Sequence, residues 1–156
     1  MNKIIIHRSK SADTRSADHL VTRQELKEDT LSHISDVMKG MNEISYEIHQ
    51  RALEHDWTKL DYFPEFFKQF HTAQLTGEWG EGWYDKIHIT NERHHLRDNP
   101  PEDVDLIDVI EQIVDCVMAG LARSGEYRDE SIPDELLQKA YKNTVKKLLD
   151  KIEVKQ

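Results

Sequence analysis

The sequence holds a single cysteine, Cys116, among its 156 residues. One cysteine excludes a disulfide framework and any zinc site built on several thiolates. Long apolar runs are absent too, so no segment is typical of a transmembrane helix or of a secretory signal peptide. These absences together predict a soluble protein of the reducing cytoplasm, with no membrane segment.

Basic residues are few. The chain has 21 Lys and Arg against 30 Asp and Glu, a formal net charge of −9. This balance disfavours nonspecific binding to nucleic acid or to anionic membranes, because both attract basic surfaces. Local binding of a phosphate through metal ions or a few well-placed cations stays open. The length itself predicts one domain with one core.

Histidine is plentiful by contrast. The chain has nine histidines, and six of them lie between His49 and His95. Candidate metal ligands in chain order are His33, His55, Asp56, His88, His94, His95 and Asp115. Imidazole and carboxylate together suit divalent metals such as zinc, manganese, iron or nickel. An ion bound in this way makes a hydroxide nucleophile from water near neutral pH and polarises a phosphoryl oxygen.

The first 21 residues predict an extended N-terminal arm. A short β-prone run, Ile4 to Ile6, precedes a polar stretch that has neither a helical nor a strand period. The arm carries an excess of positive charge that includes Lys10 and Arg15. Such charge is usually solvated, but Arg15 is also well shaped to contact a phosphate if the arm folds over a site.

Residues 22–156 predict an all-α domain of about five to six helices around one core. Thr22 and Glu25 form a capping-box pattern at the start of a helix, with a break expected near Gly40. Further helices are expected from Pro64 to Gly77, over 84–96, over 104–125 and from about 131 to 152. The segment 76–86, rich in glycine and tryptophan, predicts a loop, with Trp79 and Trp83 as its anchors or as stacking surfaces for a base.

The histidines and aspartates can converge in such a fold. On one helix, His88 and His95 would share a face because they are seven residues apart. Helices of a bundle can direct ligands from several segments to one interior point. The duller interpretation of Asp115 is a solvated acidic face shared with Asp108 and Glu111.

The stretch "EHDWTK" (54–59) and its surroundings resemble the HD-domain superfamily, named for a His-Asp pair. That pattern of a histidine, the pair and a distant aspartate would here be His33, His55-Asp56 and Asp115. Many members continue the pair as His-Asp-x-Gly-Lys; this chain has Thr58 in place of the glycine and retains Lys59. Members with two metals add histidines in the interval that here holds His88, His94 and His95. A closer likeness, in "SKSADTRSADHLVT", "NERHHL" and the helix over 104–125, is to an uncharacterised HD-like family borne by phages and prophages.

The resemblance implies an α-helical fold, one or two divalent ions (Mn, Fe, Ni, Zn or Mg) and, most often, phosphoester hydrolysis. It implies metal ligation by His33, His55, Asp56, His88, His95 and Asp115. Asp56 and Lys59 would be catalytic, and Lys59, Arg15 and His94 would contact the substrate. The expected substrate is a small phosphorylated molecule such as a nucleotide, used in phage nucleotide metabolism or counter-defence in the host cytoplasm.

Two rival functions share these residues. Some HD-like proteins with extra histidines hold two irons and activate oxygen, which makes a di-iron oxygenase the first alternative. The second is a non-catalytic protein that sequesters a nucleotide or binds a partner protein. Self-association into a homo-oligomer stays open as well.

Overall fold

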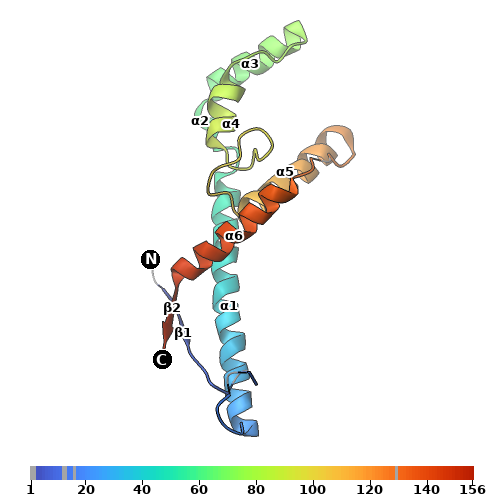
Figure 1. The fold of residues 1–156 in the computed structure, drawn as a ribbon. Helices are drawn as coiled ribbons and strands as arrows, with labels where there is room; N and C mark the ends of the chain where they lie inside the picture. The colour runs from blue at the N-terminus through green and yellow to red at the C-terminus, as the bar shows by residue number, and fades with distance from the viewer. Residues whose placement is uncertain (1–2, 12–13, 16, 129) are drawn as a thin grey trace. The chain divides into compact units, whose positions relative to one another are not determined.

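The computed structural model describes residues 3–11, 14–15, 17–128 and 130–156. The chain divides into two compact units, Met1–Glu47 with Val145–Gln156 and Ile48–Thr144, called here the first and the second unit. The all-α prediction is confirmed, because helices dominate and the only described sheet has two short strands (Figure 1). None of the helices in the described ranges is long and apolar enough to span a bilayer.

The first unit pairs the two ends of the chain. Strand β1 (Ile4–His7) runs parallel to β2 (Ile152–Lys155), with Ile4 opposite Ile152, and Figure 1 shows them side by side. β1 coincides with the predicted β-prone run. The expectation that the last helix continues to Ile152 is wrong, since α6 (Asp134–Lys151) ends one residue earlier. The β-branched residues of β2 suit a strand once β1 offers backbone hydrogen bonds.

Helix α1 (Arg23–Glu54) begins at the predicted capping box. The backbone N–H of Thr22 donates to Glu25 Oε2 over 2.8 Å, and the N–H of Glu25 donates to Thr22 Oγ1 over 3.3 Å. The break expected near Gly40 is wrong, because α1 continues through it. A single glycine costs a helix only about 1 kcal/mol, which the flanking helix formers can offset.

An ionic cluster joins α6 to α1 inside the first unit. Lys151 Nζ lies 2.6 Å from Glu43 Oε1 and also pairs with Glu47, whose second oxygen lies 2.5 Å from Lys147 Nζ. Burial opposes ionisation of Glu47, but the two lysines outweigh it and hold the pKa of Glu47 below its ordinary value. The cluster therefore favours the folded first unit when Glu47 is ionised.

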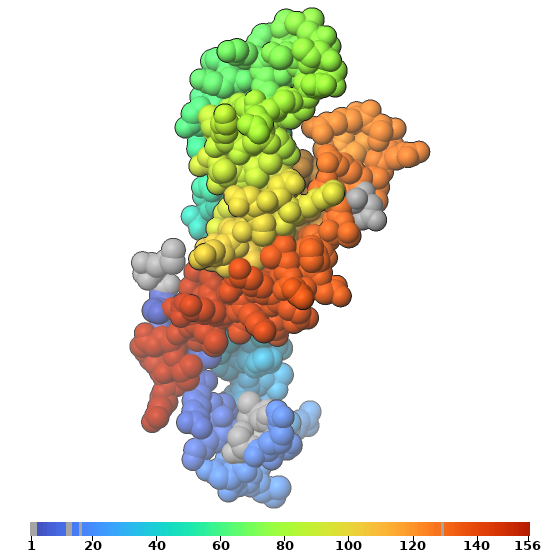
Figure 2. All heavy atoms as spheres, turned by 45° about the horizontal axis from the view of Figure 1, so that its top comes forward, coloured from blue at the N-terminus to red at the C-terminus, as the bar shows by residue number. Residues whose placement is uncertain are grey.

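The second unit is built around a small apolar core of Leu96, Val104, Val109 and Ala140. Its elements are the end of α1, α2 (Trp57–Asp61), α3 (Phe63–Thr76), the π-helix η1 (Tyr84–His88), α4 (Ile89–Asn91), α5 (Leu106–Ser124) and the start of α6. In Figure 2 the yellow segment around residues 92–104 lies against the orange residues of α5 and α6. Leu96 and Val104 supply the buried contacts of this segment.

Helix α3 and the loop after it agree with the prediction. Pro64 stands in the first turn of α3, and Gly77 closes the helix at φ 77° with its N–H donating to Ala73 O. The side chain of Gln69 then holds the loop, because its Nε2 donates to Gly80 O over 2.9 Å and its Oε1 accepts from Tyr84 N–H over 2.7 Å. The loop is thereby tied to the start of η1.

Two helical expectations are wrong in detail. The helix expected over 84–96 ends at Asn91, and Glu92 is extended at φ −93°, so His94 and His95 follow the helix. On α5, the helical spacing of Leu106, Val109, Ile110, Ile113, Val117 and Leu121 predicts a buried apolar stripe, but Ile110 is 40 % exposed and Ile113 is 50 % exposed. The buried face of α5 includes the polar residues Asp108 and Gln112 instead. Arg93, in the segment after α4, donates two hydrogen bonds to Asp108 on this buried face.

Candidate metal centre

The His-Asp pair occupies the turn between α1 and α2. Asp56 adopts a left-handed backbone conformation (φ 58°, ψ 23°), unlike any other non-glycine residue in the described ranges. Aspartate tolerates this conformation better than most residues, yet it still costs free energy. Strained backbone of this kind concentrates at functional sites, where the surrounding structure maintains it.

The carboxylate of Asp56 lies between two groups of nitrogens. Its Oδ2 pairs with Lys59 Nζ and lies 3.5 Å from His55 Nε2. Its Oδ1 is buried without a hydrogen-bond partner, 3.5 Å from His88 Nε2 and 3.8 Å from His94 Nε2. A buried carboxylate oxygen that faces imidazole nitrogens at these distances suits a shared cation, because an unpaired buried charge is otherwise costly.

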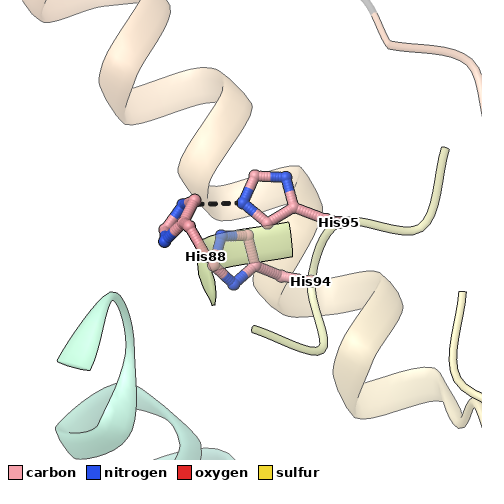
Figure 3. A group of neighbouring side chains, drawn as sticks. All are labelled: His88, His94 and His95. Carbon is pink, nitrogen blue, oxygen red and sulfur yellow. Dashed lines mark hydrogen bonds between the residues drawn. The ribbon is translucent and has the colours of Figure 1, made fainter. Parts of the chain in front are cut away.

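Three histidine rings lie close together beside Asp56, two of them facing its Oδ1, and Figure 3 shows the three rings. His88 comes from η1, while His94 and His95 come from the segment after α4, and one nitrogen of each lies within 4.8 Å of the others. His88 Nε2 and His95 Nε2 are 2.8 Å apart. Two imidazole nitrogens on one tetrahedral ion with ~2.1 Å bonds would be ~3.4 Å apart. The rings therefore need only small shifts to share an ion.

The protonation of these rings favours metal binding. Burial, and then the neighbouring His95, lower the pKa of His88 to about 3. Burial, and then His94, lower the pKa of His95 to about 4. Both imidazoles are therefore neutral at physiological pH, which is the form that binds metals.

One oxygen of Glu111 lies beside both His55 and His94. Its Oε1 lies 2.9 Å from His55 Nδ1 and 3.1 Å from His94 Nδ1. Burial would raise the pKa of Glu111, but these two contacts outweigh it and lower the pKa. Both rings direct Nδ1 toward Glu111 and Nε2 toward Asp56, with Nε2 3.5 Å from Asp56 in His55 and 3.8 Å in His94. A carboxylate behind a ligating imidazole is a common way to orient metal ligands.

Asp115 completes the side of Asp56 that faces His55. Its Oδ1 lies 3.7 Å from His55 Nε2. The attraction to Asp115, followed by the hydrogen bond to Glu111, raises the pKa of His55 to about 10. The contact with His55 in turn lowers the pKa of Asp115 to about 2. Without metal, protonated His55 and Lys59 supply the positive charge near three carboxylates, a role that a divalent ion can take over.

Arg93 places the His94-His95 pair on α5. Its Nε and Nη2 each donate to one oxygen of Asp108 over 2.8 Å, and Asp108 is fully buried. Asp108 also accepts the N–H of Asp105 in the capping box of α5. The chain next to the two histidines is thereby tied to the first turn of α5.

The structure brings together most of the predicted site. His55, Asp56, Lys59, His88, His94, His95 and Asp115 all belong to the second unit and meet around Asp56. His33 and Arg15 are exposed residues of the first unit, and their roles stay predictions. His94, expected at the substrate, is only 2 % exposed and points one nitrogen at Asp56, which suits a metal ligand better.

Sequence reasoning missed two carboxylates. From the sequence, Glu111 was considered only in the alternative of a solvated acidic face, and its position one turn before Asp115 was the available signal. Glu92, inside the "NERHHL" motif, is 4 % exposed and joins Asp56 and His88 in a third potential ligand group. Trp83 is 5 % exposed and stacks on His88 with ring centroids 4.8 Å apart, so it is an anchor and not an open surface for a base.

No family model, curated protein or solved structure matches this chain. The likeness to the HD superfamily rests on the motif residues alone and stays a prediction. The chemistry of the donor set stands independently of it, because imidazoles and carboxylates from separate elements lie together around Asp56, whose Oδ1 is buried without a hydrogen-bond partner. These residues fit a divalent transition metal better than magnesium, which prefers oxygen ligands.

A groove of about 330 Å³ opens beside the centre. Its polar lining residues are Arg51, His55, Glu111 and Asp115, and the rest of the lining is apolar, with Ile48, Ile107, Ile110, Val114 and Met118 among it. A mostly apolar hollow with a few polar groups at one end is typical of small-molecule sites.

Proposed function

We propose that the second unit binds one or two divalent metal ions and hydrolyses a phosphoester bond of a small phosphorylated molecule, with a nucleotide as the favoured class. The observation that carries this proposal is the buried, unpaired Oδ1 of Asp56, which faces His88 and His94 while Oδ2 faces His55. One carboxylate with nitrogens on both sides is suited to bridge two ions.

The ligands divide into two sets. Asp56 Oδ1 with His88, His94 and His95 would hold one ion, and Asp56 Oδ2 with His55 and Asp115 would hold a second. Manganese, iron, nickel and zinc are the candidates that this donor set favours. A divalent ion at these residues would polarise a phosphoryl oxygen and lower the pKa of water.

Lys59 would neutralise charge on the substrate. In the metal-free protein it pairs with Asp56 Oδ2. With that oxygen on a cation, the ammonium group of Lys59 would be available to donate to phosphate oxygens and would stabilise the negative charge that develops on them. The groove beside His55 and Asp115 would accept the rest of the substrate. For a phage-encoded protein, this activity would adjust nucleotide pools or remove a defence signal in the host cytoplasm.

The test is a phosphate-release screen of nucleotides, including cyclic ones, in Mn²⁺, Ni²⁺, Zn²⁺ and Fe²⁺, beside elemental analysis of the purified protein. Asp56→Asn should abolish turnover and lower the amount of bound metal, because it removes the charge and keeps the size of the side chain. Asp61→Asn makes the same change at an exposed position five residues along and should leave both unchanged.

Each rival has a distinct outcome in this screen. Two irons per chain with oxygen consumption and no phosphate release would favour the oxygenase. Tight nucleotide binding without turnover in every metal would favour a binding protein. A protein that binds none of the four ions, with His55 and Asp56 intact, would overturn the metal centre itself.

A further inference from the structure

A buried hydrogen-bonded chain lies behind His88. Thr58 is 0 % exposed, and its hydroxyl oxygen lies 2.7 Å from His88 Nδ1 and 2.7 Å from Glu92 Oε1. The backbone N–H of Thr58 donates to the same Glu92 oxygen over 3.0 Å. All three side chains are at least 96 % removed from solvent, so their protons must be matched within the group.

The protons of Thr58, His88 and Glu92 can be placed on these hydrogen bonds in one way. Glu92 Oε1 accepts two hydrogen bonds from Thr58, as an ionised carboxylate does. The single hydroxyl proton of Thr58 is used in one of them, so toward His88 the hydroxyl oxygen can only accept. His88 must therefore donate from a protonated Nδ1, so its Nε2 carries no proton and accepts the hydrogen bond from His95 Nε2–H.

This unprotonated Nε2 is the atom that faces the centre. It lies 2.8 Å from His95 Nε2 and 3.5 Å from Asp56 Oδ1. Trp83 stacks on the His88 ring at an interplanar angle of 25°, and Tyr84 packs against it at 5.4 Å between ring centroids. These rings oppose a flip of the imidazole that would exchange its two nitrogens.

We propose that Thr58 and Glu92 are positioning residues that hold His88 with Nδ1 protonated and Nε2 presented to a divalent metal ion. This inference rests on the proposed metal centre for its purpose, but the protonation of His88 is a property of the metal-free protein. Glu92 acts on His88 through Thr58, because its Oε1 accepts both the hydroxyl and the backbone N–H of Thr58. Hydrogen bonds of this kind behind a ligating histidine typically change metal affinity by about 10–100-fold.

The first experiment uses the wild-type protein without metal. Nitrogen-15 NMR of the histidine rings distinguishes an Nδ1–H imidazole from an Nε2–H imidazole. His88, assigned by its loss in His88→Gln, should show the Nδ1–H pattern between pH 6 and 8. A dominant Nε2–H pattern would overturn the inference without any variant of Thr58.

The second experiment measures Mn²⁺ and Zn²⁺ affinity by titration calorimetry. Thr58→Val removes the hydroxyl and keeps the volume, so affinity should fall about 10–100-fold and the Nδ1–H pattern should be lost. Thr58→Ser keeps the hydroxyl and should restore both. Glu92→Gln weakens the acceptor behind Thr58 and should give an intermediate loss. Thr144→Val is the matched control, because the Thr144 hydroxyl serves Leu106 N–H and Ala140 O in the same unit.

The two hypotheses fail in different ways. If wild-type protein binds neither ion, the proposed function fails. The NMR pattern still decides whether Thr58 and Glu92 hold His88 with Nδ1 protonated. If wild-type protein binds metal but Thr58→Val and Glu92→Gln retain full affinity and the Nδ1–H pattern, the positioning role of Thr58 and Glu92 is wrong. The metal centre itself then stands. If Thr58→Val does not fold, Thr58→Ser and Glu92→Gln decide the same question.

Discussion

Arg93 and Asp108 form a two-pronged ion pair in which each carboxylate oxygen accepts one N–H over 2.8 Å. Asp108 is completely buried, and Arg51 lies 3.1 Å from its Oδ1. Arg93 immediately precedes His94, and Asp108 belongs to the first turn of α5. Glu111 lies further along the same helix. The position of the two histidines relative to Glu111 therefore depends on a contact that is outside the ligand set.

Arg93→Lys should lower divalent metal affinity at least tenfold, although it retains the positive charge. Lysine cannot reproduce two parallel hydrogen bonds to one carboxylate, so the 93–95 segment loses its orientation. The free energy of unfolding of the same variant should be about 1–3 kcal/mol lower, because the buried carboxylate of Asp108 loses part of its pairing. Calorimetric metal titration and urea unfolding measure the two effects. Arg97→Lys, at an exposed position, is the control, and equal behaviour of the two variants would contradict the role of Arg93.

Glu111→Gln should reduce metal affinity by about 10–100-fold while the fold is retained. One oxygen of the Glu111 carboxylate lies beside both His55 and His94. The amide oxygen of glutamine carries no full negative charge and attracts both rings less strongly. Metal titration of the variant beside Glu102→Gln, which alters an exposed residue before α5, isolates the effect. Unchanged affinity in Glu111→Gln would show that the two imidazoles are oriented by other contacts.

Asp56→Ala should be less stable than Asp56→Asn by about 1–2 kcal/mol in the absence of metal. Both variants remove the carboxylate charge, but only alanine meets the full steric cost of the left-handed conformation at φ 58°. Urea unfolding of both proteins in a chelator gives the difference. Equal stability would mean that the turn relaxes to another backbone conformation when Asp56 is replaced.

The first unit should lose stability in acid partly through Glu47. Its folded pKa lies below the ordinary value of 4.5 because of Lys147 and Lys151. The contribution is therefore complete above about pH 4.5, where Glu47 is ionised in both states, and is lost as the pH falls through the folded pKa. Amide hydrogen exchange of residues 40–47 and 145–151 between pH 3 and 6 should show less acid sensitivity in Glu47→Gln than in wild type. The control Glu153→Gln, exposed in β2, should keep the wild-type profile.

Local signals in the sequence were enough for much of the secondary structure. The capping box at Thr22, the start of α3 at Pro64 and its end at Gly77 each follow from hydrogen bonds or backbone angles within a few residues. The expected break near Gly40 and the expected helical end at Ile152 were wrong, each for its own reason. Glycine is only mildly unfavourable in a long helix, and the strand at Ile152 depends on a partner almost 150 residues earlier.

The sequence by itself determined the all-α class and the residue types of the centre, because helix signals are local and imidazoles with carboxylates have a known preference for divalent metals. The tertiary structure decided which of these side chains meet. It brought His94 next to Glu111 and turned Nε2 of His88 toward Asp56. Such choices depend on the ends of helices, on the left-handed turn at Asp56 and on the ion pair of Arg93, and these arise only when distant segments pack together.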